Sequence, residues 1–204
     1  THCISSAASD VYKRQGQIFQ TILAMKAGTR VYAAVAPAFI GQFGPKLTPE
    51  RFREAMKELG FADVVEVAAG ADLCTIQEAK DFLEEVPEKI PFMGTSCCPS
   101  WSVMAKTEFP QYANCISMAL TPMVFTGRMI KKADPGCKVA FIGPCAAKKL
   151  EASRRSVRSD VDFVITFEEL DAMFAAKGID PNQTEGESSM HDATAAGRGY
   201  ALSL

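Results

Sequence analysis

The sequence predicts an α/β fold: a largely parallel sheet flanked by helices. Short apolar, β-prone runs alternate along the chain with segments whose apolar residues recur at helical spacing. Parallel strands need long crossover connections, which these helical segments would supply. The chain has 204 residues, 48% of them hydrophobic, which is enough for one sizeable core.

Five apolar runs are expected to form strands: Arg30–Val35, Val64–Val67, Pro91–Met93, Lys138–Ile142 and Asp162–Thr166. Helices are expected between them, at Gly16–Lys26, Thr48–Leu59, Thr75–Leu83, Thr121–Lys132 and from Thr166 to Gly178. Thr48 followed by Pro49 is typical of a helix start, and Gly60 of a helix end. Thr166 and Glu169 have the spacing of a capping box.

Composition excludes several classes of function. A net charge of −2 gives no reason to expect nucleic acid or an anionic membrane as a partner. No apolar run approaches a membrane span, and Val31–Ile40 is interrupted by Pro37. Seven cysteines, an odd number that includes an adjacent pair, suit a reducing compartment, so we expect a cytoplasmic protein.

The N-terminal residues are set aside. Ser5–Gln15 resembles the translation of a common sequencing adaptor, so residues 1–15 are expected to be a non-native tail. Residues 16–204 are then one partial domain, and the natural protein is expected to be longer in both directions.

Two cysteine segments dominate the rest, Thr95–Trp101 and Gly143–Glu151. Each follows an apolar run and precedes a helical pattern, where the helix dipole stabilises a thiolate. Together they offer two half-sites for a soft metal or an iron–sulfur cluster. The adjacent pair Cys97 and Cys98 could be a strained disulfide, two buried thiols, or one metal ligand beside one free thiol.

These segments, T-S-C-C-P-S-W and G-P-C-A-A-K-K-L-E, resemble the first two cysteine signatures of the [FeFe]-hydrogenase catalytic domain, with collinear matches from about Arg30 to Tyr200. The resemblance implies a partial H-domain whose full-length parent holds an H-cluster, made of a 4Fe-4S cluster and a two-iron subcluster. It makes Cys98 and Cys145 ligands of the four-iron cluster. It makes Cys97 the proton donor beside the two-iron unit.

The same resemblance implies further site residues. Lys148 would hold a cyanide of the two-iron unit, and Pro37 and Ala38 would line the cavity. Glu78, Ser117 and Asp81 would continue a proton relay from Cys97, through a water, to solvent. Without the resemblance, Glu78 and Asp81 would be a solvated acidic face and Ser117 an ordinary loop serine.

Neighbouring residues carry weaker expectations. Glu151 could pair with Lys148 or with a helix N-terminus, and Lys149 is expected to face solvent. Met118 and Met123 are candidates to reach the cavity.

The sequence departs from the family pattern in three ways. Gly143 stands where catalytic members have methionine, which predicts lost packing around the two-iron unit, and Ser100 replaces a commoner glycine. The third cysteine signature, which carries the remaining cluster ligands, is expected downstream of Leu204. A four-iron cluster needs four ligands, so this chain alone is not expected to hold a stable H-cluster or to be active.

The leading hypothesis is a fragment of an [FeFe]-hydrogenase, an enzyme that interconverts H₂ with protons and electrons. Its implied partners are ferredoxin, or another iron–sulfur electron carrier, and hydrogenase maturation factors. Two alternatives stay open: a hydrogen-sensing module, and a non-catalytic hydrogenase-like iron–sulfur protein such as an assembly factor. A thiol oxidoreductase is disfavoured, because Cys97 and Cys98 lack a two-residue spacer.

Overall fold

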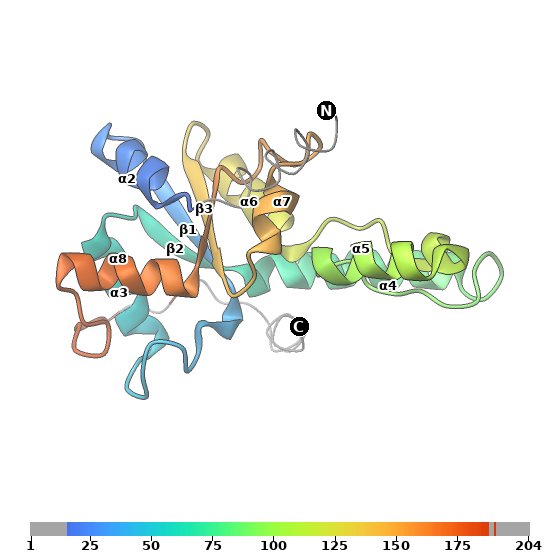
Figure 1. The fold of residues 1–204 in the computed structure, drawn as a ribbon, viewed down its shortest axis with the longest axis horizontal. Coiled ribbons are helices and arrows are strands. Elements are labelled where there is room, and N and C mark those ends of the chain that lie inside the picture. The colour runs from blue at the N-terminus through green and yellow to red at the C-terminus, as the bar shows by residue number, and fades with distance from the viewer. Residues whose placement is uncertain (1–15, 188–189, 191–204) are drawn as a thin grey trace, which may run out of the picture.

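The structure, a computed structural model, describes residues 16–187 and residue 190. The proposed N-terminal tail, His191 and the glycine-bearing segment 195–200 lie outside these residues. Four strands form one sheet in the order β2-β1-β3-β4: β1 (Val31–Val35), β2 (Asp63–Glu66), β3 (Lys138–Gly143) and β4 (Phe163–Thr166) (Figure 1). All three neighbouring pairs are parallel, which confirms the predicted fold class.

The helices connect and cover these strands. They are α2 (Ile18–Lys26), α3 (Pro49–Leu59), α4 (Val67–Glu85), α5 (Pro99–Glu108), α6 (Pro122–Ala133), α7 (Ala147–Ala152) and α8 (Phe167–Lys177). Two short 3₁₀ helices complete the described part of the chain, η1 (Pro37–Phe39) and η2 (Pro110–Cys115).

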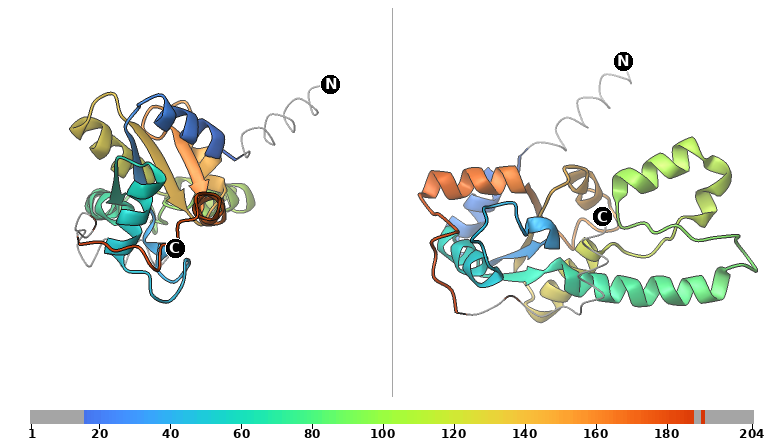
Figure 2. Two further views of the ribbon diagram at one scale, coloured as in Figure 1. Left: turned by 90° about the vertical axis from the view of Figure 1, so that its left-hand side faces the viewer. Right: turned by 90° about the horizontal axis from the view of Figure 1, so that it is seen from below.

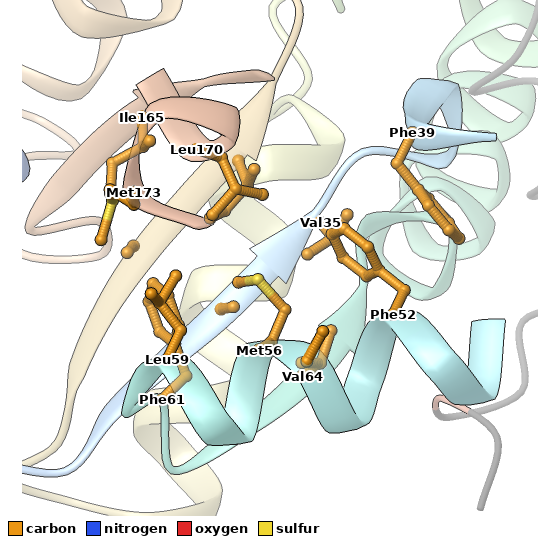
Figure 3. Packing of buried hydrophobic residues seen from close by; sticks show 14 of the residues in the cluster. Val35, Phe39, Phe52, Met56, Leu59, Phe61, Val64, Ile165, Leu170 and Met173 are labelled. Carbon is orange, nitrogen blue, oxygen red and sulfur yellow. The ribbon is translucent and has the colours of Figure 1, made fainter. Parts of the chain in front are cut away.

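One face of the sheet packs against α2, α3 and α8. Side chains from β1, α3 and α8 point toward one another in this core (Figure 3). Phe52 lies among aromatic rings, stacked on Phe39 at 4.7 Å between ring centroids and edge-on to Phe174 at 6.3 Å. Such close aromatic packing makes this face the main source of hydrophobic stabilisation.

The opposite face packs against α6, with Met123, Val124 and Ile130 in contact with strand residues. Helix α4 crosses α6 at Gly70, where a Cβ atom would lie 2.3 Å from Thr126 Oγ1 and 2.4 Å from the carbonyl oxygen of Pro122. The two helices can therefore approach this closely only because residue 70 has no side chain.

Most predicted helix ends are confirmed. The Thr48 hydroxyl accepts a hydrogen bond from the Arg51 N–H, and Gly60 ends α3 in the left-handed conformation. Thr166 and Glu169 form the predicted capping box of α8. The start of α4 was predicted too late, at Thr75. The helix begins at Val67, directly after β2, and its packing on α6 accounts for the tolerated glycine.

The predicted strand at Pro91–Met93 is wrong. The chain there is extended but unpaired until Gly94, which forms an isolated parallel bridge with Ile116. The Gly94 N–H donates to the Cys115 carbonyl, and the Ser117 N–H donates to the Gly94 carbonyl, both at 2.8 Å. A proline cannot donate to a strand ladder, so apolar character alone was not enough.

Residues 73–118, called the arm from here on, project away from the sheet (Figures 1 and 2). The arm contains most of α4, all of α5 and η2, and the segments between them. Eleven of the fifteen exposed large hydrophobic side chains among the described residues belong to it. None of the helices in this part of the chain is long and apolar enough to cross a membrane.

Candidate functional site

A cavity of about 130 Å³ lies where the arm meets the carboxyl edge of the sheet. Strands β1 and β3 end beside each other there, with the Ala36 N–H donating to the Ile142 carbonyl at 2.8 Å. Carboxyl ends of parallel strands are the usual place for ligands in open α/β sheets. The lining includes six residues singled out from the sequence: Pro37, Ala38, Cys97, Cys98, Cys145 and Lys148.

The sheet contributes one wall of this cavity. After β1 the chain turns into η1, which places Pro37 and Ala38 on the lining. After β3 it passes through Pro144 to Cys145, which is half-buried. The expected position of Cys145, on a loop that follows a strand, is therefore found.

The arm contributes the adjacent cysteines. Cys98 is the N-cap residue of α5 and is half-buried, whereas Cys97 is only 3% exposed. The Thr95 hydroxyl lies 3.7 Å from the Cys97 sulfur. Both are free thiols, as is Cys145, so the vicinal-disulfide alternative is excluded in this structure. The sulfur atoms stand on two separate loops that share one cavity.

Lys148 joins the two loops. Its ammonium donates to the Cys97 carbonyl at 2.8 Å and to Glu151 Oε2 at 2.8 Å. The second oxygen of Glu151 accepts a hydrogen bond of 2.7 Å from the Thr121 hydroxyl. Of the two partners left open for Glu151, Lys148 is therefore the one found, and the pair is buried.

Lys149 was predicted to face solvent, and this is wrong. It is 5% exposed, and its ammonium lies 2.6 Å from Glu169 Oε1. Glu169 also accepts a hydrogen bond from the Thr166 N–H in the capping box of α8. A carboxylate distant in sequence thus allows the lysine to be buried, as buried charges require.

The expected relay residues occupy different surroundings. Glu78 is buried on α4, and Asp81 follows it on the same helix and accepts a hydrogen bond from Gln77 at 2.8 Å. Ser117 is buried, and its hydroxyl accepts from the Ala119 N–H at 3.1 Å. It lines a second, polar cavity of about 170 Å³ together with Glu151. Their relay role stays a prediction.

Phe141 is a cavity residue that sequence reasoning missed. A Cβ atom on Gly143 would lie 2.6 Å from the Phe141 ring and 3.3 Å from the Ala36 Cβ. Alternate residues of a strand share a face, so the ring of Phe141 occupies the space beside Gly143. The lost packing predicted at Gly143 is therefore supplied from two positions upstream. Met123 also lines the cavity, whereas Met118 is 84% exposed.

The donor set of the cavity fits part of an iron–sulfur cluster. Cysteine sulfur is the usual ligand of such clusters, and a four-iron cluster takes four. The cavity presents Cys98 and Cys145 beside a lysine cation, which is half of that set. Residues 16–187 and 190 contain no group of three or more histidine, cysteine, aspartate or glutamate side chains arranged to hold a metal ion.

Known proteins resemble this chain. Residues 29–203 match the family described as "Iron only hydrogenase large subunit, C-terminal domain". Iron hydrogenase 1 of Clostridium pasteurianum is 31% identical over 165 residues, covering 74% of this chain and 28% of that protein. The cytosolic Fe-S cluster assembly factor NAR1 of Kluyveromyces lactis is 37% identical over 108 residues, covering 52% of this chain and 23% of that protein.

Solved structures agree with the sequence comparison. The [FeFe]-hydrogenase HydA(deltaEFG), solved in a study of stepwise H-cluster assembly, superposes with a TM-score of 0.76 and 25% identity. The match covers 87% of this chain and 51% of that one. This chain thus spans about half of the solved hydrogenase and about a quarter of each of the two curated relatives. Both its sequence and its fold show that the chain belongs to the family of iron-only hydrogenase catalytic domains.

Proposed function

We propose that this chain is part of an [FeFe]-hydrogenase that interconverts H₂ with protons and electrons. The observation that carries the proposal is the meeting of Cys98 and Cys145, from two separate loops, at one cavity that also holds Cys97 and Lys148. The activity is assigned to the longer parent protein, because the chain spans only part of its relatives.

Each cavity residue has a proposed task. An H-cluster, when bound, supplies the redox chemistry of H₂ formation and cleavage. Cys98 and Cys145 hold its four-iron part, and the Lys148 ammonium binds an anionic ligand of its two-iron part. Cys97, beside them but not a ligand, gives and takes a proton. Pro37, Ala38 and Phe141 form an apolar wall that limits access of water.

We also propose that protons travel from Cys97, through a water, to Glu78, Ser117 and Asp81. Burial of Glu78 and Ser117 supports this path, because interior positions for a carboxyl and a hydroxyl need a polar role. A hydroxyl donates and accepts at once, which suits the middle position. Asp81 is half-buried and is the outermost member.

Partners and location follow from the same proposal. Electrons would come from ferredoxin or another iron–sulfur carrier, and maturation factors would install the cluster. A cytoplasmic location is proposed from the cysteine content and from the assembly factors named as cytosolic among the relatives. One related hydrogenase, from Nitratidesulfovibrio vulgaris, is named as periplasmic, so fractionation of the source cells would test the location.

The test uses the matured full-length parent. Infrared bands of iron-bound carbonyl and cyanide, together with H₂ turnover, are expected in the unsubstituted protein. Cys98→Ala and Cys145→Ala should lose both, whereas Cys97→Ser should keep the bands and lose at least about 100-fold in turnover. Cys137→Ala is the matched control, because this buried thiol lies before β3, at the other end of the strand from the cavity. Bands that survive both ligand substitutions would contradict the assignment.

A second test uses the 204-residue chain. With two of the four proposed ligands, it should retain fewer than four irons per chain after reconstitution and desalting. Four stably bound irons would show that the described cysteines suffice.

A non-catalytic iron–sulfur protein is the second candidate, favoured by the match to the assembly factors. Such a protein would bind iron and sulfide but show no carbonyl or cyanide bands and no turnover. A hydrogen-sensing parent would instead show the bands with slow turnover, and a signalling domain in the same reading frame.

A further inference from the structure

The contact between Lys148 and Glu151 has a consequence for the shape of the cavity. Glu151 is 3% exposed and receives hydrogen bonds from two elements, Lys148 on α7 and Thr121 at the N-cap of α6. Lys148 in turn donates to the Cys97 carbonyl. We propose that Glu151 is a positioning residue, which fixes the Lys148 ammonium and, through it, the backbone of the loop that carries Cys97 and Cys98.

Donor counting supports this role. An ammonium group has three N–H donors, and two of those on Lys148 go to Glu151 and to the Cys97 carbonyl. Lys148 also lines the cavity, so its remaining donor is the one that can reach a ligand there. A lysine side chain has many rotamers, and a fixed carboxylate selects the one in which all three directions are used.

The chain of contacts crosses the boundary between the two halves of the site. Thr121, Glu151 and Lys148 belong to the part built on the sheet, whereas the Cys97 carbonyl belongs to the arm. Glu151 therefore sets how the cysteine loop of the arm lies against the loop that carries Cys145, before any ligand binds. The inference rests on the proposed function only for the identity of that ligand.

The neighbouring pair on α7 provides a matched control. Lys149 and Glu169 are also a close lysine–glutamate pair, with side chains 3% and 20% exposed, against 12% and 4% for Lys148 and Glu151. Neither Lys149 nor Glu169 lines the cysteine cavity. A general loss of packing around α7 should follow from breaking either pair, whereas loosening of the Cys97–Cys98 loop should follow only from Glu151.

The experiment measures amide hydrogen exchange in residues 94–100 of the complete 204-residue chain without a cluster. Glu151→Gln and Glu151→Ala should speed exchange in this segment about 10-fold or more. Glu169→Gln should leave it within about twofold of the unsubstituted chain. Lys148→Met should reproduce the Glu151 effect, since it removes the same link from the other side.

A second readout is chemical. A short bifunctional thiol reagent, applied in a Cys97→Ser background, should join Cys98 to Cys145, and Glu151→Gln should lower that yield severalfold. Equal effects of the Glu151 and Glu169 variants on residues 94–100, or no effect of either Glu151 variant, would overturn the proposal. If both Glu151 variants fail to fold, Lys148→Met decides by the same criterion. Because the chain carries no cluster in these measurements, their outcome is independent of whether the parent makes H₂.

Discussion

The sheet region and the arm differ in how far each completes its own core. The sheet has helices on both faces, and buried side chains on each face form a continuous cluster. The arm leaves most of its large apolar side chains exposed, among them Leu83 at 78% and Val103 at 54%. Exposed apolar surface of this extent usually marks a contact with another part or partner. The sheet region is therefore stabilised by this chain itself, and the arm less so.

The candidate site lies on the border between these regions, and each supplies part of it. Cys145, Lys148, Pro37 and Ala38 come from the sheet region, while Cys97 and Cys98 come from the arm. The hydrogen bond from Lys148 to the Cys97 carbonyl joins the two. Site geometry thus depends on the less self-sufficient half as much as on the rigid one.

The largest expected contrast is between core substitutions in the two regions. Phe52→Ala removes a fully buried ring from between three others and should lower the free energy of unfolding by about 3–5 kcal/mol. Leu83→Ala, on the arm, should change it by less than about 0.5 kcal/mol. Urea unfolding followed by circular dichroism measures both. Equal losses would show that the arm has a core of its own.

The anchoring of the arm is tested by Gly70→Ala. The new methyl group would meet the Pro122 carbonyl oxygen at 2.4 Å, and a backbone atom cannot move aside as a side-chain end can. We expect a loss of about 3 kcal/mol, at the upper end of overpacking effects. Lys80→Ala, at an exposed position farther along α4, is the control and should be nearly neutral. Unfolding midpoints within error of each other for the two variants would argue against close α4–α6 packing.

The border itself is tested by Gly143→Met. Here the obstacle is the outer edge of the Phe141 ring, which can rotate or shift, so a smaller loss of about 1–2 kcal/mol is expected. Combined with Phe141→Ala, the methionine should fill vacated space, and the double variant should be more stable than the sum of the single losses. Strict additivity in urea unfolding would mean that the two positions do not compete for space.

The same contrast explains what could be predicted from sequence. Four of the five expected strands formed, because apolar runs such as Lys138–Ile142 carry a local signal. The fifth, Pro91–Met93, belongs to the arm, where apolar character reflects exposed surface rather than a strand. The early start of α4 was missed because its glycine is explained only by contact with α6.

Site prediction followed the same division. The motif placed the three cysteines and Lys148, and the cavity gathers them. Lys149 and Phe141 were misjudged because their surroundings come from distant residues, Glu169 for one and the space at Gly143 for the other. No pattern within a few residues of Lys149 reveals its partner, and the space beside Phe141 is defined by the folded sheet.

The smallest expected effect concerns a thiol of the sheet region, Cys137, which precedes β3. Burial, reinforced by the negative charge of Asp134, raises its pKa above the usual range. Above about pH 8.5 the thiol ionises in the unfolded chain while the folded chain retains the proton, so stability falls as pH rises. The loss is at most about 1.4 kcal/mol per pH unit. Cys137→Ala should flatten this alkaline decline.

Tyr32 provides the control for that measurement, since burial and a hydrogen bond to Asp134 raise its pKa as well. Tyr32→Phe should flatten the decline only at higher pH, near the ordinary range of a phenol at about 10. The free energy of unfolding, measured in urea between about pH 7.5 and 10.5, separates the two. If Cys137→Ala keeps the full decline, the base of the sheet is open to water. The sealed interior that distinguishes the sheet region from the arm would then end short of Cys137.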